Sequence, residues 1–324
     1  MTRLLTLLSA WLWLPLAAAA SPGGEPTAWL LRMASSVQEL NYAGRFVYSR
    51  AGQLETMQVV HQVDANGERE HLLSLDGSQR EMVRDGDSAV CILGDQPPVW
   101  LDRSTARTAF PASRIADVDR LGEHYSLVLG GEARVAGRVA RELAIRPRDQ
   151  LRYGYRLLVD EQSGLPLKSE LLGDSGEVLE QILFTELTLQ ESADPQWMES
   201  IKQRKQRARA AIGHAETPVA AAVRRWHVAE LPAGFGIAAY RSYPMQQGDA
   251  SVDHLVFSDG LATVSVYVEP TGSESPLSGA GRMGAVSTYA RVHAGHQIVV
   301  VGDVPMATVR QIGGAVVPAP GTAQ

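Results

Sequence analysis

Turn signals recur at near-regular intervals in the first third of the chain, and they constrain the fold more than any other feature. Asn66-Gly67, Asp76-Gly77 and Asp85-Gly86 lie about ten residues apart. Such dipeptides favour tight hairpin turns, because their residues accept the positive φ angles that these turns require. Short apolar runs such as MQVVHQV, HLLSL and AVCIL fill the gaps between them. The pattern therefore predicts an antiparallel β-meander.

Strand patterns extend this predicted sheet on both sides of the turns. In residues 41–50, Tyr42, Phe46 and Tyr48 alternate with polar residues, which indicates a half-buried strand with an aromatic face. Further strand-like runs occupy residues 124–149, 152–160, 165–172 and 177–187. We expect an antiparallel domain that ends near Leu189.

Two helices are expected in the same part of the chain. Residues 26–40 carry apolar side chains at helical spacing, which predicts an amphipathic helix. Ser113 has the residue type of a helix N-cap and predicts a short helix that runs through Leu121.

A smaller block follows a change in composition. Residues 193–222 are basic at their start and rich in alanine, which indicates a linker whose first half has helical character. Beyond it, Asp259-Gly260 predicts a hairpin with a two-residue turn. A two-residue turn would pair Phe257 with Ala262 and Leu255 with Val264, so the apolar side chains would share one face of the hairpin.

The rest of this block predicts a small α+β domain. Residues 281–292 have helical character and residues 296–305 form a strand pattern. The last residues, 314–324, have the composition of a disordered tail.

The N-terminus has the features of an export signal. Arg3 is followed by an apolar core from Leu4 to Leu16 and by small residues that end in a cleavage site after Ala20. We therefore expect a soluble exported protein in five parts. These are a signal peptide at residues 1–20, a large domain at 21–192, a linker at 193–222, a small domain at 223–313 and a disordered tail at 314–324.

Composition argues against nucleic-acid binding and against thiol chemistry. Thirty basic and thirty-six acidic residues give a formal charge of −6, so the overall balance does not attract nucleic acid. Cys91 is the single cysteine, which leaves no internal disulfide. Within SAVCIL it is expected to be a small buried hydrophobic residue rather than a reactive thiol.

The sequence GDSG at residues 173–176 matches the four residues around the nucleophile of chymotrypsin-like proteases. A serine nucleophile also needs a histidine base, and in those proteases the histidine stands in an Ala-His-Cys context. None of the eight histidines has that context, and Glu177 replaces the second glycine that continues the motif.

A hairpin turn explains GDSG better than a catalytic site does. Two strand patterns flank it, and Asp, Ser and Gly are the residues that tight turns select. With Asp174 and Ser175 at the centre of the turn, the predicted register places Leu171 opposite Val178 and Leu167 opposite Ile182.

Other candidate sites are weaker still. His293 and His296 are close enough in sequence to share a metal ion, but further ligands are not evident. The glycines of LGGEARVAG lack the strand-to-helix setting of a phosphate loop, and Asp117 and Asp119 fit a solvated helix face. We therefore predict no catalytic residue, no metal ligand and no cofactor.

One charged feature remains. A dense basic run in the linker is a candidate contact for anionic lipid, lipopolysaccharide or an acidic partner segment, with a solvated helix as the simpler alternative. The run consists of Lys202, Arg204, Lys205, Arg207 and Arg209.

Several long stretches resemble the MucB/RseB family of periplasmic negative regulators of the extracytoplasmic stress (sigma-E/AlgU-type) sigma factor. They include YAGRFVYSR, HQVDANGEREHLLSLDGSQREMVRDGD, GEARVAGRVARELAIRPRDQLRYGYRLLVDEQSGLPLKSELL and FSDGLATVSVYVEP. The resemblance runs in order through nearly all of the chain after the signal peptide. The alanine-rich basic linker departs from it.

The resemblance implies an α+β fold with two domains. The first is a large half-open antiparallel β-barrel with helices, similar to the lipoprotein carriers LolA and LolB, and the second is a small C-terminal α/β domain. It also implies binding to the periplasmic segment of a transmembrane MucA/RseA-type anti-sigma factor, which is shielded from the site-1 protease. Lipopolysaccharide or mislocalised lipoprotein is implied as the releasing signal.

Two groups of residues are candidates for these implied roles. Tyr42, Phe46 and Tyr48 are candidates to line a lipid cavity, with ordinary core packing as the alternative. Residues 261–268 are a candidate edge strand for an extended partner peptide. Phe257, Val264 and Tyr267 are the candidates to contact that peptide.

Two other functions remain as alternatives. One is a lipid or lipoprotein carrier without a regulatory partner, and the other is a periplasmic hydrolase that uses Ser175. The sequence leaves the oligomeric state open.

Overall fold

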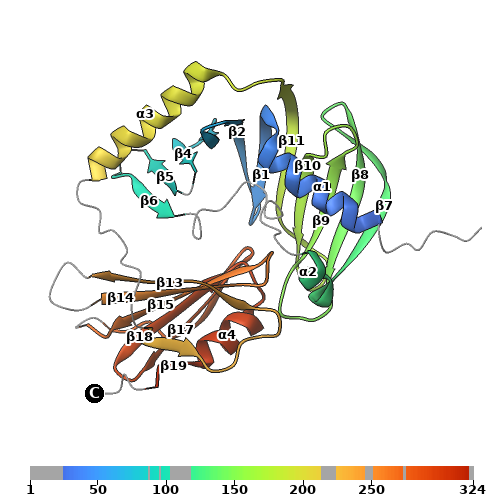
Figure 1. Cartoon of the computed structure of the whole chain (residues 1–324). Helices are drawn as coiled ribbons and strands as arrows, with labels where there is room; N and C mark the ends of the chain where they lie inside the picture. The colour runs from blue at the N-terminus through green and yellow to red at the C-terminus, as the bar shows by residue number, and fades with distance from the viewer. Residues whose placement is uncertain are drawn as a thin grey trace, which may run out of the picture.

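The structure is a computed structural model that describes residues 25–86, 88–94, 96–102, 118–212, 224–244, 251–272 and 275–320. The predicted signal peptide and Ser113 lie outside these residues. Figure 1 shows two antiparallel sheets with helices packed on them, which confirms the predicted α+β class. We call residues 25–212 the N-terminal half and residues 224–320 the C-terminal half. Among the described residues, none of the helices combines the length and the apolar composition of a membrane span.

The N-terminal half is built on one large open sheet. Within the described residues it has eleven strands in the order β6-β5-β4-β3-β2-β1-β11-β10-β9-β8-β7. Two meanders therefore join where β1 pairs with β11, and the sheet stays half-open as predicted. The strands are β1 Asn41–Arg50, β2 Gln53–Asp64, β3 Gly67–Ser74, β4 Arg80–Asp85, β5 Ser88–Leu93, β6 Val99–Asp102, β7 Tyr125–Val135, β8 Arg138–Pro147, β9 Gly154–Asp160, β10 Pro166–Leu172 and β11 Val178–Gln190.

Two helices cover this sheet near β7. The predicted amphipathic helix is α1, Glu25–Glu39, and its Leu30 and Met33 are buried among strand residues. Helix α2, Val118–His124, packs against β7. It ends beyond the predicted end at Leu121.

The first part of the predicted linker is a helix that packs on the large sheet. Helix α3 is Pro195–Ile212, and it contacts β3, β4 and β5 (Figure 1). The Asp194 carboxylate caps its start by accepting the backbone N–H groups of Gln196 and Trp197. Met198 and Ile201 are buried against the sheet side. The first half of the predicted linker is therefore helical, as its composition indicated, but its packing on the sheet was not predicted.

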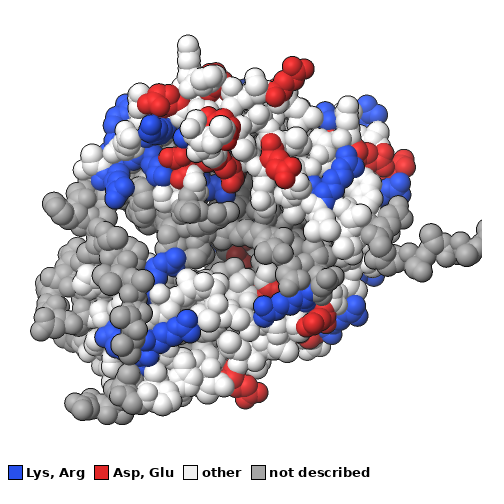
Figure 2. All heavy atoms as spheres, viewed as in Figure 1, with Lys and Arg blue, Asp and Glu red and all other residues white. Residues whose placement is uncertain are grey.

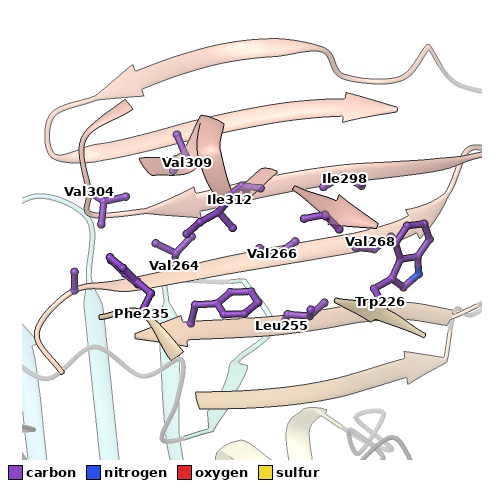
Figure 3. Close-up of a cluster of buried hydrophobic side chains, with 14 residues drawn as sticks. Trp226, Phe235, Leu255, Val264, Val266, Val268, Ile298, Val304, Val309 and Ile312 are labelled. Atoms are coloured by element: carbon purple, nitrogen blue, oxygen red, sulfur yellow. The ribbon is translucent and has the colours of Figure 1, made fainter. Parts of the chain in front are cut away.

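The C-terminal half contains a smaller sheet covered by one helix. Its six strands in the described residues follow the order β13-β14-β15-β18-β17-β16, and β12 pairs separately with β19. Val309 and Ile312 of α4, Met306–Gly314, pack with apolar strand residues in the core that Figure 3 shows. The strands are β12 Trp226–Val228, β13 Gly236–Pro244, β14 Ser251–Ser258, β15 Thr263–Pro270, β16 Gly279–Met283, β17 Val286–His293, β18 His296–Gly302 and β19 Val316–Pro318.

The hairpin of β14 and β15 has a different register from the predicted one. Phe257 pairs with Val264 rather than Ala262, so a four-residue loop replaces the two-residue turn. The Asp259 carboxylate explains the longer loop, because it accepts the backbone N–H groups of Leu261 and Ala262. A shift of two residues keeps the apolar side chains on one face.

Two further predictions for this half are wrong. Residues 281–292 form most of the β16–β17 hairpin instead of a helix, and Gly284 takes a φ of 62° at its turn. The predicted tail begins inside α4, and Val316 of β19 is fully buried in its pairing with β12. Short apolar runs carry too little periodicity to separate helix from strand.

Candidate functional site

Two loop tips of the C-terminal half pack into the apolar core of the N-terminal half. Leu261, from the β14–β15 loop, and Ala285, from the β16–β17 turn, join one buried cluster with residues of α1, α2 and the strands β7–β10. Leu30 and Tyr125 are members of the same cluster. We call this contact between the halves the joint.

Asp259 provides the polar centre of the joint. One carboxylate oxygen, Oδ1, holds its own loop, because it accepts the N–H groups of Leu261 at 2.9 Å and Ala262 at 2.8 Å. The other oxygen, Oδ2, faces the N-terminal half and accepts a hydrogen bond of 2.9 Å from the Tyr125 hydroxyl. The same Oδ2 lies 3.0 Å from Nε of Arg152.

Arg152 contacts both halves through its guanidinium group. Nη1 donates to the Asp149 carboxylate at 3.0 Å, and Nη2 donates to the backbone carbonyl of Ala233 at 2.6 Å. Its guanidinium carbon lies 5.6 Å from the ring centre of Tyr125 and 5.2 Å from that of Phe235. The side chain has no exposed surface. Arg152 therefore holds partners from both halves at once.

Burial also fixes the protonation state of Tyr125. Removal from water raises the pKa of the phenol well above its ordinary value, and the Asp259 carboxylate raises it further. The hydroxyl therefore keeps its proton and acts as a donor to Asp259.

Two more contacts between the halves lie near Asp259. The Thr308 hydroxyl of α4 donates to the carbonyl of Leu151 at 2.5 Å. Gly234 has a φ of 85°, and any Cβ at this position would clash with the ring of His124. The glycine therefore permits the close approach of this loop to α2.

The chemistry of the joint favours discrete arrangements over gradual movement. A buried ion pair is tolerated while all of its partners are present, and loss of one partner leaves a charge in a water-poor site. Opening the joint would separate Asp259 from both Tyr125 and Arg152. We call the arrangement in this structure closed, and an arrangement in which this contact is broken open.

The three aromatic residues predicted for a lipid cavity lie in a packed core. Tyr42 and Phe46 are buried in a cluster that includes Val37 of α1, and Tyr48 packs at its margin. Phe46 lies 5.6 Å from the ring of Phe184. Core packing, the alternative role, describes their surroundings.

The predicted edge strand is an interior strand. β15 pairs with β14 on one side and β18 on the other, so its backbone offers no free edge to a peptide. Phe257 and Val264 face the α4 core, whereas Tyr267 is on the opposite face and stacks on His254 at 4.3 Å. The sequence did not reveal that β18, a distant segment, completes this pairing. In the described residues the outer strands of the sheet are β13 and β16.

Two residues of the basic run hold α3 to the sheet. Arg204 pairs with Glu81 at 2.7 Å, and Lys205 pairs with Asp85 at 3.3 Å. Lys202 lies 3.8 Å from Glu199 of the same helix. Figure 2 shows the basic side chains gathered over α3, at the upper left. The remaining members of the run, Arg207 and Arg209, also lie on α3.

The other residues considered from sequence are not brought into a catalytic arrangement. Ser175 is exposed in the β10–β11 turn, and the register differs from the prediction because a bulge places Val178 opposite Leu172. His293 and His296 face each other across the β17–β18 turn. Among the described residues, no third metal-ligating side chain lies close to these two histidines.

The remaining sequence candidates are a thiol and two aspartates. Cys91 is half-buried, and burial raises the pKa of its thiol. Asp117 and the side chain of Asp119 lie outside the described residues.

Sequence reasoning missed the joint itself. Asp259 was interpreted only as a turn residue, and nothing in the sequence connects it with Arg152 or Tyr125. The available signal for the joint was the loop that follows β14, where the charged Asp259 stands next to the apolar Leu261 and Ala262.

This fold, an open sheet joined to a smaller sheet by a buried polar contact, defines a two-domain protein. The chain belongs to the MucB/RseB family. The sequence model of the MucB/RseB N-terminal domain matches residues 25–202, and that of the MucB/RseB C-terminal domain matches residues 220–317.

Relatives of this family match the chain along most of its length. The sigma factor AlgU regulatory protein MucB of Pseudomonas aeruginosa is 34% identical over 328 residues, which cover 96% of this chain and 95% of that protein. The sigma-E factor regulatory protein RseB of Escherichia coli K12 is 27% identical and covers 91% of each chain.

Solved structures of this family match the chain along most of its length. The crystal structure of MucB in complex with MucA(peri) has a TM-score of 0.67 and 31% identity, and the match covers 90% of this chain and 98% of that one. The complex of Pseudomonas aeruginosa MucA and MucB has a TM-score of 0.68 and 32% identity, with 91% and 99% covered.

Proposed function

We propose that this protein is a periplasmic regulator that binds the periplasmic segment of a transmembrane MucA/RseA-type anti-sigma factor. Bound in this way, it shields that segment from site-1 proteolysis and keeps the envelope-stress sigma factor inactive. The observation that carries the proposal is the match to MucB over both halves of the chain, in sequence and in structure. MucB is the partner of MucA in two of the matched structures.

The regulator acts by binding rather than by catalysis. The candidate nucleophile Ser175 stands in an exposed turn, and its backbone N–H is held by the Glu177 carboxylate at 3.0 Å. The export signal predicted at residues 1–20 supplies the route to the periplasm.

The joint suggests how a lipid signal would release the partner. Leu261 and Ala285 occupy apolar surface of the N-terminal half. An acyl chain that competes for this surface must displace them, and that movement separates Arg152 from Asp259. If the anti-sigma segment prefers the closed arrangement and lipid prefers the open one, each ligand weakens binding of the other.

Lipopolysaccharide or the acyl chains of a mislocalised lipoprotein fit this signal. The exposed part of the basic run on α3 is the candidate contact for their anionic groups, because two members of the run are already paired with the sheet. The aromatic residues at Tyr42, Phe46 and Tyr48 would contact the acyl chains only if their packed cluster opened.

A protease-protection assay tests the proposal. Purified site-1 protease and the periplasmic segment of the MucA-type protein from the same genome are incubated with residues 21–324 of this chain. We expect cleavage to slow at least tenfold, and lipopolysaccharide to restore it. Albumin at the same concentration is the control. An unchanged cleavage rate contradicts the regulator, whereas protection that lipopolysaccharide does not relieve contradicts only the lipid signal.

A further inference from the structure

Four polar side chains form a row across β1, β2, β3 and β4. Tyr42 is opposite His61, His61 is opposite Glu70, and Glu70 is opposite Arg84. Side chains at directly opposed positions share one face of the sheet. Glu68, two residues before Glu70 on the same strand, adds a second carboxylate to this face.

The row is buried on the sheet face opposite to α3. His61 has no exposed side-chain surface, Glu70 has 2%, and Arg84 has 9%. Glu68 is at the rim with 24% of its side chain exposed. Charged groups in such a place need compensation, because burial of an unpaired charge is costly.

The hydrogen bonds of His61 determine which ring nitrogen carries a proton. Nδ1 lies 2.8 Å from the carbonyl oxygen of Leu40, which only accepts hydrogen bonds, so Nδ1 is the protonated nitrogen. Stacking on Tyr42, at 4.8 Å between ring centres, fixes the ring plane. In a neutral ring, Nε2 then presents its lone pair to Oε1 of Glu68 at 3.1 Å. Two lone pairs at that distance repel each other unless a cation lies between them.

The net charge of the row also favours a bound cation. Nη2 of Arg84 donates to Oε1 of Glu68 at 2.5 Å and to Oε2 of Glu70 at 3.0 Å. Two carboxylates therefore face one guanidinium group, and with His61 neutral the row carries one negative charge. Oε1 of Glu70 is buried without a hydrogen-bond partner, as is the Tyr42 hydroxyl.

We propose that His61, Glu68 and Glu70 bind a divalent transition-metal ion, with Zn²⁺ as the preferred ion. Nε2 of His61 and one carboxylate oxygen from each glutamate lie within 4.8 Å of one another. Zinc bonds of about 2.0–2.2 Å place neighbouring ligand atoms about 3.3 Å apart in a tetrahedral site, close to the observed His61–Glu68 spacing. Imidazole among the ligands favours zinc over Mg²⁺ or Ca²⁺.

The surroundings of His61 match those of a metal ligand. A ligating histidine usually donates its other N–H to a carbonyl or carboxylate, as Nδ1 does here to Leu40. Arg84 keeps its contact with Oε2 of Glu70 while Oε1 turns to the metal, and Oε1 of Glu68 is shared between Arg84 and the metal. The competing cation is a proton shared by His61 and Glu68.

Zinc binding to purified residues 21–324, treated with a chelator and dialysed, tests the proposal by calorimetry. We expect one Zn²⁺ per chain, with affinity at least tenfold weaker in His61→Gln and in Glu70→Gln. His71→Gln is the matched control, because His71 is the neighbouring strand histidine, on the opposite face, and pairs with Glu81 at 3.0 Å. Its zinc affinity should be unchanged.

The visible absorption spectrum of the Co²⁺-loaded protein provides a second readout that does not depend on the buried variants. Glu68→Gln, a change at the exposed rim, should alter that spectrum and weaken binding even if His61→Gln fails to fold. No zinc binding by the unaltered protein overturns the proposal. Equal zinc binding by all variants assigns the metal to surface histidines and also overturns it.

Discussion

Arg152 and Asp259 form an ion pair across the joint, with Nε and Oδ2 3.0 Å apart and no exposed surface on either side chain. The two residues belong to different halves of the protein, so the pair exists only while the halves are in contact. Tyr125 donates a hydrogen bond to Asp259, and Arg152 donates one to the carbonyl of Ala233. The pair thus reports directly on the arrangement of the two halves.

Removing one partner of this pair should destabilise the protein strongly. Asp259→Ala leaves the Arg152 charge buried without its counterion, and we expect a loss of about 3–5 kcal/mol in the free energy of unfolding. Urea unfolding followed by circular dichroism measures the loss. Glu186→Gln is the control, because its pair with Arg45 is exposed and should contribute less than about 1 kcal/mol. Equal effects of the two substitutions would contradict a stabilising role of the buried pair.

Gly234→Ala should weaken the joint through sterics rather than charge. The backbone takes a φ of 85°, which costs about 1–2 kcal/mol with a side chain present, and the new Cβ would also clash with His124. Gly295→Ala is the matched control, because Gly295 has a φ of 72° and open space around it. Thermal unfolding should show a larger decrease in Tm for Gly234→Ala. Equal decreases would mean that α2 and this loop are not tightly packed.

The attachment of α3 should depend on pH through Glu81. The hydrogen bond with His71 is the main cause that lowers the pKa of this carboxyl group, and Arg204 lowers it further against the opposing effect of burial. Because the folded pKa lies below the unfolded one, this stabilisation is complete above the ordinary pKa of about 4.3 and is lost as the pH falls through the folded value.

Urea unfolding at a series of pH values between 5 and 3 measures this dependence. Glu81→Gln should be less stable than the unaltered protein at pH 5, and the difference should shrink toward pH 3. A difference that stays constant across the series would mean that the charge of Glu81 does not contribute to stability.

Ser175→Ala should leave the protein unchanged. The side chain is exposed in a turn that is held by hydrogen bonds between Gly173, Gly176 and Glu177. Binding of the anti-sigma segment and the Tm should both equal those of the unaltered protein. An ester-hydrolysis activity that disappears with this substitution would revive the hydrolase alternative.

The sequence predicted the β-meander because its turn residues report local backbone geometry, and Gly67, Gly77 and Gly86 do take positive φ angles. Registers were less predictable. At Asp259 a side-chain hydrogen bond lengthened the loop, and beside Leu172 a bulge shifted the pairing. Both changes depend on a single contact that residue periodicity does not record.

The joint was beyond the reach of sequence patterns for a different reason. Arg152, Tyr125 and Asp259 come from three distant segments, and only the packing of the two halves brings them together. The polar row on β1–β4 also depends on a register that the sequence did not fix. The Asn66-Gly67 signal located the turn, but Gly67 already pairs with Asp64, so the turn residues are Ala65 and Asn66. A turn centred on Asn66-Gly67 would instead place His61 opposite Leu72.

Calorimetric titration tests the central claim most directly. Residues 21–324 are titrated with the periplasmic segment of the MucA-type protein from the same genome, with and without lipopolysaccharide. The account predicts tight binding that is lost or weakened at least tenfold when the lipid is present. Absence of binding, with lipopolysaccharide still bound by the protein, would contradict the regulator and support a lipid carrier on the same fold.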